Sequence, residues 1–242
     1  MRLGFYLNPI ARLRGSYDEG EPDPVLFASI AEIAGVDIIL IGWNPTGRIV
    51  TERDVKIIRE LVKNDMVLVV PGVHDHIEPV VRNHPNGVIL LPTDWDGVQP
   101  VTPVQFQYEG DQLKDTISGY KSAGIPVSVF IDPDISNVRS CARSQVAGVV
   151  FDCANYSNAR TDEEAEAALK GLENAAMAAD KFGLVISFAH GLHYRNIGPV
   201  AALPFGEELY VGKSIVSRAL VNGLDRAIND MKTTIFRSKL NN

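Results

Sequence analysis

The residues with the clearest chemistry lie in two short segments near the end of the chain, His190-Gly191 and Gly212-Lys213-Ser214. Because glycine has no Cβ, the backbone N–H groups at Gly191 and Gly212 can approach a ligand closely. Ser214 begins a predicted helix, whose free N–H groups and positive end favour an anion, and Lys213 adds a full positive charge. The pattern predicts a phosphate site, and its alternative is a plain strand–turn–helix corner in which the glycines only make the turn.

The best acid–base candidate is His190, because imidazole titrates near neutral pH. The alternative interpretation is that His190 makes only a structural hydrogen bond at the end of a strand. Asp152 follows the preceding predicted strand and could orient His190 or act as a base itself, or it could cap a helix or form a salt bridge at the rim. Lys213 could instead form a Schiff base with a carbonyl substrate, but phosphate pairing is the preferred interpretation.

Other polar residues follow the remaining predicted strands. Asn8, Asn44 and Arg48 are candidates for contacting the phosphate or the rest of a substrate. Residues 74–76 read His-Asp-His, but no Cys or Glu cluster accompanies them, so neither a metal nor another cofactor is expected. Residues 132–134 read Asp-Pro-Asp, which is typical of a turn and a helix N-cap.

The elements that position these residues are eight short apolar runs with amphipathic segments between them. Such strand–helix alternation fits either a closed barrel or a doubly wound sheet. No Gly-x-Gly-x-x-Gly follows the first run, so we predict an α/β fold of the (β/α)8 TIM-barrel type, as one domain over residues 1–242. The runs are residues 3–7, 37–41, 66–70, 87–91, 126–131, 148–151, 184–188 and 208–211.

Helix start and stop signals fall between the apolar runs. The longest irregular segment, residues 92–109, follows the fourth run and is a candidate lid, and residues 8–21 form a second loop that could cover the site. The first predicted helix begins at Asp23-Pro24 and ends at Ala34, and a second begins at Thr51. Three more predicted helices run from Gly110 to Gly124, from Thr161 to Phe182, and from Ser214 to about Met231.

Composition narrows the class of protein. The net charge of −7 without a basic cluster argues against nucleic-acid binding. The apolar runs have strand length, so no membrane span is expected. The chain begins with a strand and not a signal peptide, and its two cysteines suit a reducing cytoplasm better than a disulfide scaffold.

Taken in order, several short motifs resemble the pyridoxine 5′-phosphate synthase family over nearly the whole chain. That family condenses 1-deoxy-D-xylulose 5-phosphate with 3-amino-2-oxopropyl phosphate, needs no metal and is typically a homo-octamer. The resemblance implies substrate and phosphate roles for His190, Gly191 and Gly212, with Lys213 in place of a family histidine. The motifs are residues 22–25, 30–35, 51–55, 128–132, Tyr156, Thr161-Asp162, Ala189-His190-Gly191-Leu192, Tyr194, Asn196, 215–219 and 223–224.

The chain departs from the family pattern at most acid–base positions. The general-base glutamate of the third strand falls at Val69 and a second glutamate falls at Val150, and valine cannot take a proton. The catalytic histidine of the second strand falls at Gly42. The remaining departures are Tyr6-Leu7-Asn8-Pro9 in place of an Asn-x-Asp-His pattern, Tyr17 and Asn44 in place of arginines, Ile49 in place of a histidine, and Gln99 near the position of a threonine.

Three hypotheses follow from this combination. The first is an enzyme acting on phosphorylated small carbonyl or amino-carbonyl substrates through His190 and Asp152, with chemistry altered from that of the family. The second is a non-catalytic binder or regulator that keeps the phosphate pocket, and a mouth filled by Trp43, Tyr6 and other apolar side chains would favour it. The third is a structural partner that assembles with a true synthase.

Overall fold

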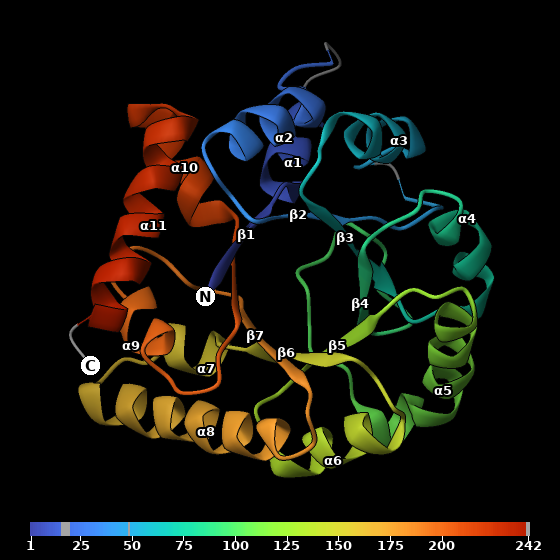
Figure 1. The fold of residues 1–242 in the computed structure, drawn as a ribbon, viewed down its shortest axis with the longest axis vertical. Helices are drawn as coiled ribbons and strands as arrows, with labels where there is room; N and C mark the ends of the chain where they lie inside the picture. The colour runs from blue at the N-terminus through green and yellow to red at the C-terminus, as the bar shows by residue number, and fades with distance from the viewer. Residues whose placement is uncertain (16–19, 48, 241–242) are drawn as a thin grey trace.

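A closed barrel of eight parallel strands forms the centre of the molecule, and helices form a ring around it (Figure 1). The structure is a computed structural model that describes residues 1–15, 20–47 and 49–240. Each of the eight predicted apolar runs overlaps a strand, which confirms the TIM barrel. The strands are β1 Arg2–Tyr6, β2 Ile38–Gly42, β3 Asp65–Pro71, β4 Gly87–Leu91, β5 Val127–Ile131, β6 Gly148–Asp152, β7 Val185–Ala189 and β8 Glu208–Val211.

Alternate residues of each strand point to opposite faces, so the apolar runs build two separate cores. The outer core lies between strands and helices and includes Phe5, Phe151 and Phe188. The inner core fills the barrel itself, and it explains why the runs are apolar at nearly every position. Its buried members are Ile38, Leu40, Val69, Ile89, Leu91, Trp95, Phe130, Val150 and Tyr210.

The helices begin where the sequence offers caps. Asp23 accepts a hydrogen bond from Val25 N, and the Thr161 hydroxyl accepts one from Glu164 N. Thr51 and Asp54 form a reciprocal capping box. The helices are α1 Asn8–Arg14, α2 Pro24–Ile33, α3 Glu52–Leu61, η1 His74–His76, α4 Ile77–Val81, α5 Phe106–Ser122, α6 Ile135–Arg143, α7 Ala154–Ser157, α8 Asp162–Asp180, α9 Ile197–Ala201, α10 Lys213–Asn222 and α11 Leu224–Leu240.

Three predicted boundaries were wrong. The predicted loop of residues 8–21 instead begins with helix α1. Pro9 is in the first turn of this helix, and Ile10 and Ala11 are buried. Helix α5 begins at Phe106 and not at Gly110, which shortens the irregular segment to residues 92–105. The last predicted helix is two helices, because Gly223 has a φ of 82° and interrupts the helical path between α10 and α11.

Polar side chains close the amino-terminal end of the barrel. The Glu208 carboxylate is buried and accepts hydrogen bonds from Arg2 Nη1 at 3.1 Å, from the Ser187 hydroxyl at 3.0 Å and from the Tyr210 hydroxyl. Arg2 also pairs with Asp65 at the start of β3. These contacts join β1, β3, β7 and β8 at the face opposite the strand ends that carry the candidate site residues.

None of the helices in the described part of the chain is both long enough and apolar enough to cross a membrane.

Candidate active site at the barrel mouth

His190 and Asp152 come together where β7 and β6 end. His190 Nδ1 lies 2.9 Å from Asp152 Oδ1, and the same carboxylate oxygen accepts a hydrogen bond from Ala154 N at 2.8 Å. A carboxylate only accepts hydrogen bonds, so it holds the proton on Nδ1 and leaves Nε2 for a substrate. The His190 side chain is 37% exposed and Asp152 only 8%, so a buried carboxylate orients an accessible imidazole.

The backbone at this corner has an unusual conformation. His190 has a φ of 74°, in the left-handed region that residues with a Cβ rarely adopt, and Gly191 follows with the same value. Such a residue costs free energy that the surrounding structure must offset, and these residues cluster at active sites. The observed conformation therefore supports a functional reason for placing His190 at the mouth.

The hydrogen bond to Asp152 raises the pKa of His190 above its ordinary value, against a smaller opposing effect of burial. We expect Asp152→Asn to lower the His190 pKa, because the neutral amide stabilises the imidazolium less. Because the His190 pKa lies above 6.5 in the folded state, the bond between His190 and Asp152 stabilises the fold fully below pH 6.5. This stabilisation is lost as the pH rises through the raised pKa. NMR titration of the His190 ring proton in both proteins measures the shift, and an unchanged pKa would contradict it.

Asp132 is a third titratable group at this mouth, at the end of β5. Burial raises the pKa of its carboxyl, and the negative charges of Asp152 and Asp134 raise it further. Residues 132–134 were predicted to be structural, and Asp134 does cap α6 through Ser136 N. Asp132 is different, since its carboxyl lies close enough to Asp152 for their charges to interact. Its position at a strand end was the signal in the sequence.

Gly191 and Gly212 follow adjacent strands, since β7 and β8 pair at Phe188 and Leu209. Neither position has room for a side chain: a Cβ on Gly191 would collide with Ser157, and one on Gly212 would lie 2.8 Å from the Tyr6 carbonyl oxygen. Helix α10 begins directly after Gly212, so the first N–H groups of that helix are available at its positive end.

Lys213 is the first residue of α10, one residue earlier than the predicted helix start at Ser214. Its side chain is exposed, and it forms no ion pair with any described residue. An ammonium group that is not neutralised, beside free helix N–H groups, is the chemistry that binds a phosphate. The Ser214 side chain is half-buried in the same first turn.

The side chain of Asn8 is occupied by backbone. Its Nδ2 donates to the Gly42 carbonyl at 2.8 Å, and its Oδ1 accepts from Gly42 N at 2.6 Å. Asn8 is buried, so this pair of bonds ties the end of β1 to the end of β2. A Cβ on Gly42 would collide with the Tyr6 hydroxyl and the Asn8 amide. Tyr6 and Asn8 therefore take up the space that a side chain at position 42 would need.

Asn44 holds the loop of residues 92–105. Its Nδ2 donates to the Trp95 carbonyl at 2.9 Å, and its Oδ1 accepts from the Thr46 amide and hydroxyl. Arg12 Nη2 reaches the same loop from α1 and donates to the Val98 carbonyl at 2.6 Å. Asn44 thus positions a loop. Two residues considered from the sequence, Arg48 and Tyr17, lie outside the described residues.

Trp95, and not Trp43, closes the inner core at the mouth. Trp95 is only 5% exposed and belongs to the cluster of Val69, Phe130 and Val150, against which Tyr6 packs. Trp43 lies instead in the outer core between strands and helices. No pattern in the sequence predicts this position for Trp95, because nothing local distinguishes a tryptophan that turns into a barrel from one that packs under a helix.

Residues 74–76 form the 3-10 turn η1 after β3. Over the described ranges, the structure brings no three or more His, Cys, Asp or Glu side chains together in a way that would hold a metal ion.

Comparison with protein families matches residues 3–237 to the family described as pyridoxal phosphate biosynthesis protein PdxJ. The chain belongs to the PdxJ family. Among its PdxJ relatives, a pyridoxine 5′-phosphate synthase of Synechococcus sp. (strain JA-2-3B'a(2-13)) is 34% identical over 232 residues, covering 96% of this chain and 97% of the relative. One of Syntrophotalea carbinolica is 34% identical, covering 96% and 98%. These matches confirm the resemblance seen in the sequence.

Solved structures with the same barrel are much less similar in sequence. A thiamine phosphate pyrophosphorylase from Pyrococcus furiosus superposes with a TM-score of 0.64 at 11% identity, covering 98% of this PdxJ chain and 96% of that chain. A structure named KGPDC from Streptococcus mutans gives 0.62 at 12% identity, covering 98% and 97%. At this level of identity the likeness supports the TIM barrel alone.

Proposed function

We propose that this PdxJ protein is an enzyme that acts on phosphorylated small carbonyl or amino-carbonyl substrates at the barrel mouth. The observation that supports it is the His190–Asp152 pair, a partly exposed imidazole held by a buried carboxylate. In this proposal His190 Nε2 moves a proton on the substrate, and Asp152 orients the ring and stabilises the imidazolium. Asp132 is a further carboxyl at the same mouth.

The phosphate of the substrate lies at the corner made by Gly191, Gly212, Lys213 and Ser214 in this proposal. Backbone N–H groups at the start of α10 and the Lys213 ammonium would receive it. Asn8 and Asn44 contribute by holding β2 and the loop of residues 92–105 in place, since the bonds above already engage their side chains. Arg48 stays a candidate on sequence grounds alone.

Replacing the lysine at this corner should weaken phosphate binding. We expect Lys213→Met to lower the affinity for 1-deoxy-D-xylulose 5-phosphate roughly tenfold to a hundredfold, because a charge-assisted hydrogen bond contributes about 1.5–3 kcal/mol. Isothermal titration calorimetry at two salt concentrations measures the affinity. The matched control is Lys181→Met at the end of α8, which should bind like the wild type. Equal affinities for the two variants would remove Lys213 from the site.

The chemistry of this protein is altered from the family reaction in our proposal. The positions that carry two glutamates and a histidine in the family pattern are Val69, Val150 and Gly42, and the two valines are buried in the inner core. Neither valine can exchange a proton, and Tyr6 with Asn8 leaves no space at Gly42. The proton transfers are therefore left to His190, Asp152 and Asp132.

A direct assay tests this proposal. The protein is incubated with 1-deoxy-D-xylulose 5-phosphate and 3-amino-2-oxopropyl phosphate, and pyridoxine 5′-phosphate and free phosphate are measured separately, beside the relative from Syntrophotalea carbinolica. We expect ring formation at least about a hundredfold slower than in the relative, as loss of a general base costs about 10²–10⁴ in rate. Release of phosphate without ring formation supports altered chemistry. Ring formation at the rate of the relative would refute it.

A second function is favoured by one observation, the apolar filling of the mouth. Tyr6, Trp95 and Phe130 pack together with Val69 and Val150, and the two valines take the positions of glutamates in the family pattern. A non-catalytic protein that binds a phosphorylated metabolite needs the phosphate corner and a stable mouth, but no proton transfer. Tight binding of either substrate with no turnover of any kind would favour this alternative.

We also propose a cytoplasmic location and a homo-oligomer, on the strength of the family resemblance and of two buried, unpaired cysteines. Residues 1–242 are proposed to act as one functional domain.

A further inference from the structure

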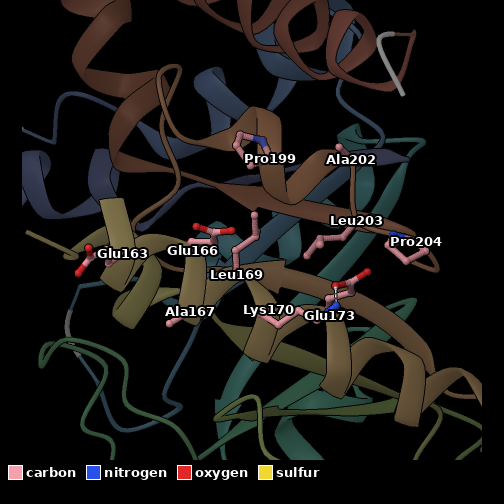
Figure 2. Close-up of a pocket in the computed structure, with 10 residues that line it drawn as sticks. All are labelled: Glu163, Glu166, Ala167, Leu169, Lys170, Glu173, Pro199, Ala202, Leu203 and Pro204. Atoms are coloured by element: carbon pink, nitrogen blue, oxygen red, sulfur yellow. Dashed lines mark hydrogen bonds and ion pairs between the residues drawn. The ribbon is translucent and has the colours of Figure 1, made fainter. Parts of the chain in front are cut away.

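A groove lies on the outside of the barrel, between α8 and the segment that runs from α9 toward β8 (Figure 2). Its volume is about 820 Å³, which is the size of a site for several side chains. One wall is a face of α8, and the other is built from Pro199, Leu203 and Pro204. In Figure 2 Leu169 and Leu203 point toward one another across the groove, so its floor is apolar.

Carboxylates line the α8 wall. Glu173 forms an ion pair with Lys170 at 2.6 Å, so that pair contributes no net charge. Glu163 and Glu166 form no ion pair with any described residue, and both lie at the groove. Glu163 is in the first turn of α8, where a carboxylate stabilises the helix. Glu166 lies beyond the first turn of α8, so stabilisation of the helix N-terminus does not explain a carboxylate at this position. The groove therefore has an apolar floor and a negative edge.

The end of α11 has the opposite character. Phe236 and Leu240 are one turn apart and are 64% and 68% exposed, so the helix carries an apolar pair that the described part of the protomer leaves uncovered. Arg237 and Lys239 lie beside this pair and are exposed. An exposed apolar pair with basic neighbours is complementary to an apolar groove with acidic edges.

The groove and the end of α11 adjoin the same short helix, α9. Pro199 of α9 lines the groove, and its neighbour Gly198 contacts the Ser238 side chain of α11 closely enough that a Cβ would lie 2.9 Å from Ser238 Oγ. Figure 1 shows α9 between α11 and α8. Two surfaces that adjoin in this way can meet reciprocally about a two-fold axis, so that each copy covers the exposed apolar pair of the other.

We propose that the groove between α8 and α9 binds the end of α11 from a second copy of this chain. In this interface Phe236 and Leu240 of one copy pack on Leu169 and Leu203 of the other, while Arg237 faces Glu166. The inference rests on the homo-oligomer in the proposed function and says where two copies meet. It does not depend on the proposed chemistry at the mouth.

Cross-linking between two singly substituted proteins tests the interface. Leu203→Cys and Phe236→Cys proteins, one carrying an affinity tag, are mixed and oxidised; the natural cysteines are buried and do not interfere. We expect a covalent heterodimer of about twice the 26.4 kDa of one chain. The matched control is Leu61→Cys mixed with Phe236→Cys, because Leu61 is an exposed leucine of α3 across the barrel. Heterodimer no more abundant than in this control would overturn the proposal.

A charge exchange tests the polar part of the same interface. We expect Glu166→Arg to weaken self-association at least tenfold in sedimentation, and Arg237→Glu in the same chain to restore it. Circular dichroism checks that each variant is folded. A wild-type chain that is monomeric at high micromolar concentration would remove both the homo-oligomer and this interface. An assembled wild type whose mass is unchanged in the Glu166→Arg variant would remove only this interface.

Discussion

His190→Ala should abolish turnover of any phosphorylated substrate while leaving the affinity for a phosphate ligand within about tenfold, or roughly 1.4 kcal/mol. The reason is the division of the site: the imidazole is held by Asp152 at the end of β6, whereas the phosphate corner is built from backbone and Lys213. A general acid or base contributes about 10²–10⁴ in rate. Steady-state kinetics measure the loss, and calorimetry with 1-deoxy-D-xylulose 5-phosphate measures the affinity.

The matched control for this variant is His193→Ala, three residues further along the same loop. His193 Nδ1 accepts a hydrogen bond from Arg195 N, and no carboxylate among the described residues pairs with the ring. Its pKa is lowered, mainly by burial, so it lacks the feature that prepares His190 for proton transfer. Turnover in His193→Ala should stay close to the wild-type value. Equal turnover in His190→Ala and wild type would remove His190 from the mechanism.

The pH dependence of turnover gives an independent measure of the pair. If His190 acts as the base, it works when the ring is neutral, and a raised pKa moves the acid limb of the profile to higher pH. Asp152→Asn should then move that limb to lower pH and also reduce the maximum rate. A merely structural Asp152 would lower the rate without moving the limb.

The sequence was sufficient to predict the barrel because its strand signal is local. Each run of Val, Ile and Leu is covered on both faces, and the turns between runs carry caps such as Thr51 and Thr161. The meeting of His190 and Asp152 followed from the same reasoning, since successive strands of a barrel end side by side. Short motifs such as Ala189-His190-Gly191-Leu192 were sufficient to predict the family, because each motif is itself local in the sequence.

Other features depend on contacts between distant segments and left no local signal. The Asn8 amide looked like a ligand group, but its partner is the backbone of Gly42, 34 residues away. Trp95 enters the inner core because Asn44 and Arg12 hold its loop over the mouth. The groove beside α9 exists only because α8 and the segment before β8 pack without filling the space between them.

The second large effect concerns the opposite end of the barrel, where Glu208→Ala should destabilise the fold by about 3 kcal/mol. The substitution removes a buried carboxylate that accepts hydrogen bonds from Arg2, Ser187 and Tyr210, and leaves the two hydroxyl groups without that acceptor inside the barrel. For a domain of this size the melting temperature should fall by roughly 10 °C. Urea unfolding with an unchanged m-value measures the free energy directly.

Two further variants separate the buried network from a general effect of charge. Glu207→Ala removes the neighbouring carboxylate, which is exposed, and should change the free energy of unfolding by less than about 0.5 kcal/mol. Glu208→Gln keeps an acceptor for the Ser187 and Tyr210 hydroxyl groups and should cost less than Glu208→Ala, which removes that acceptor. If the Ala variants at positions 207 and 208 were equally stable, the amino-terminal end of the barrel would be held by its apolar core alone. This network and the mouth lie at opposite ends of the barrel. Glu208→Ala protein that remains folded should therefore bind phosphate ligands as the wild type does, because Gly212 and Lys213 lie at the other end of β8.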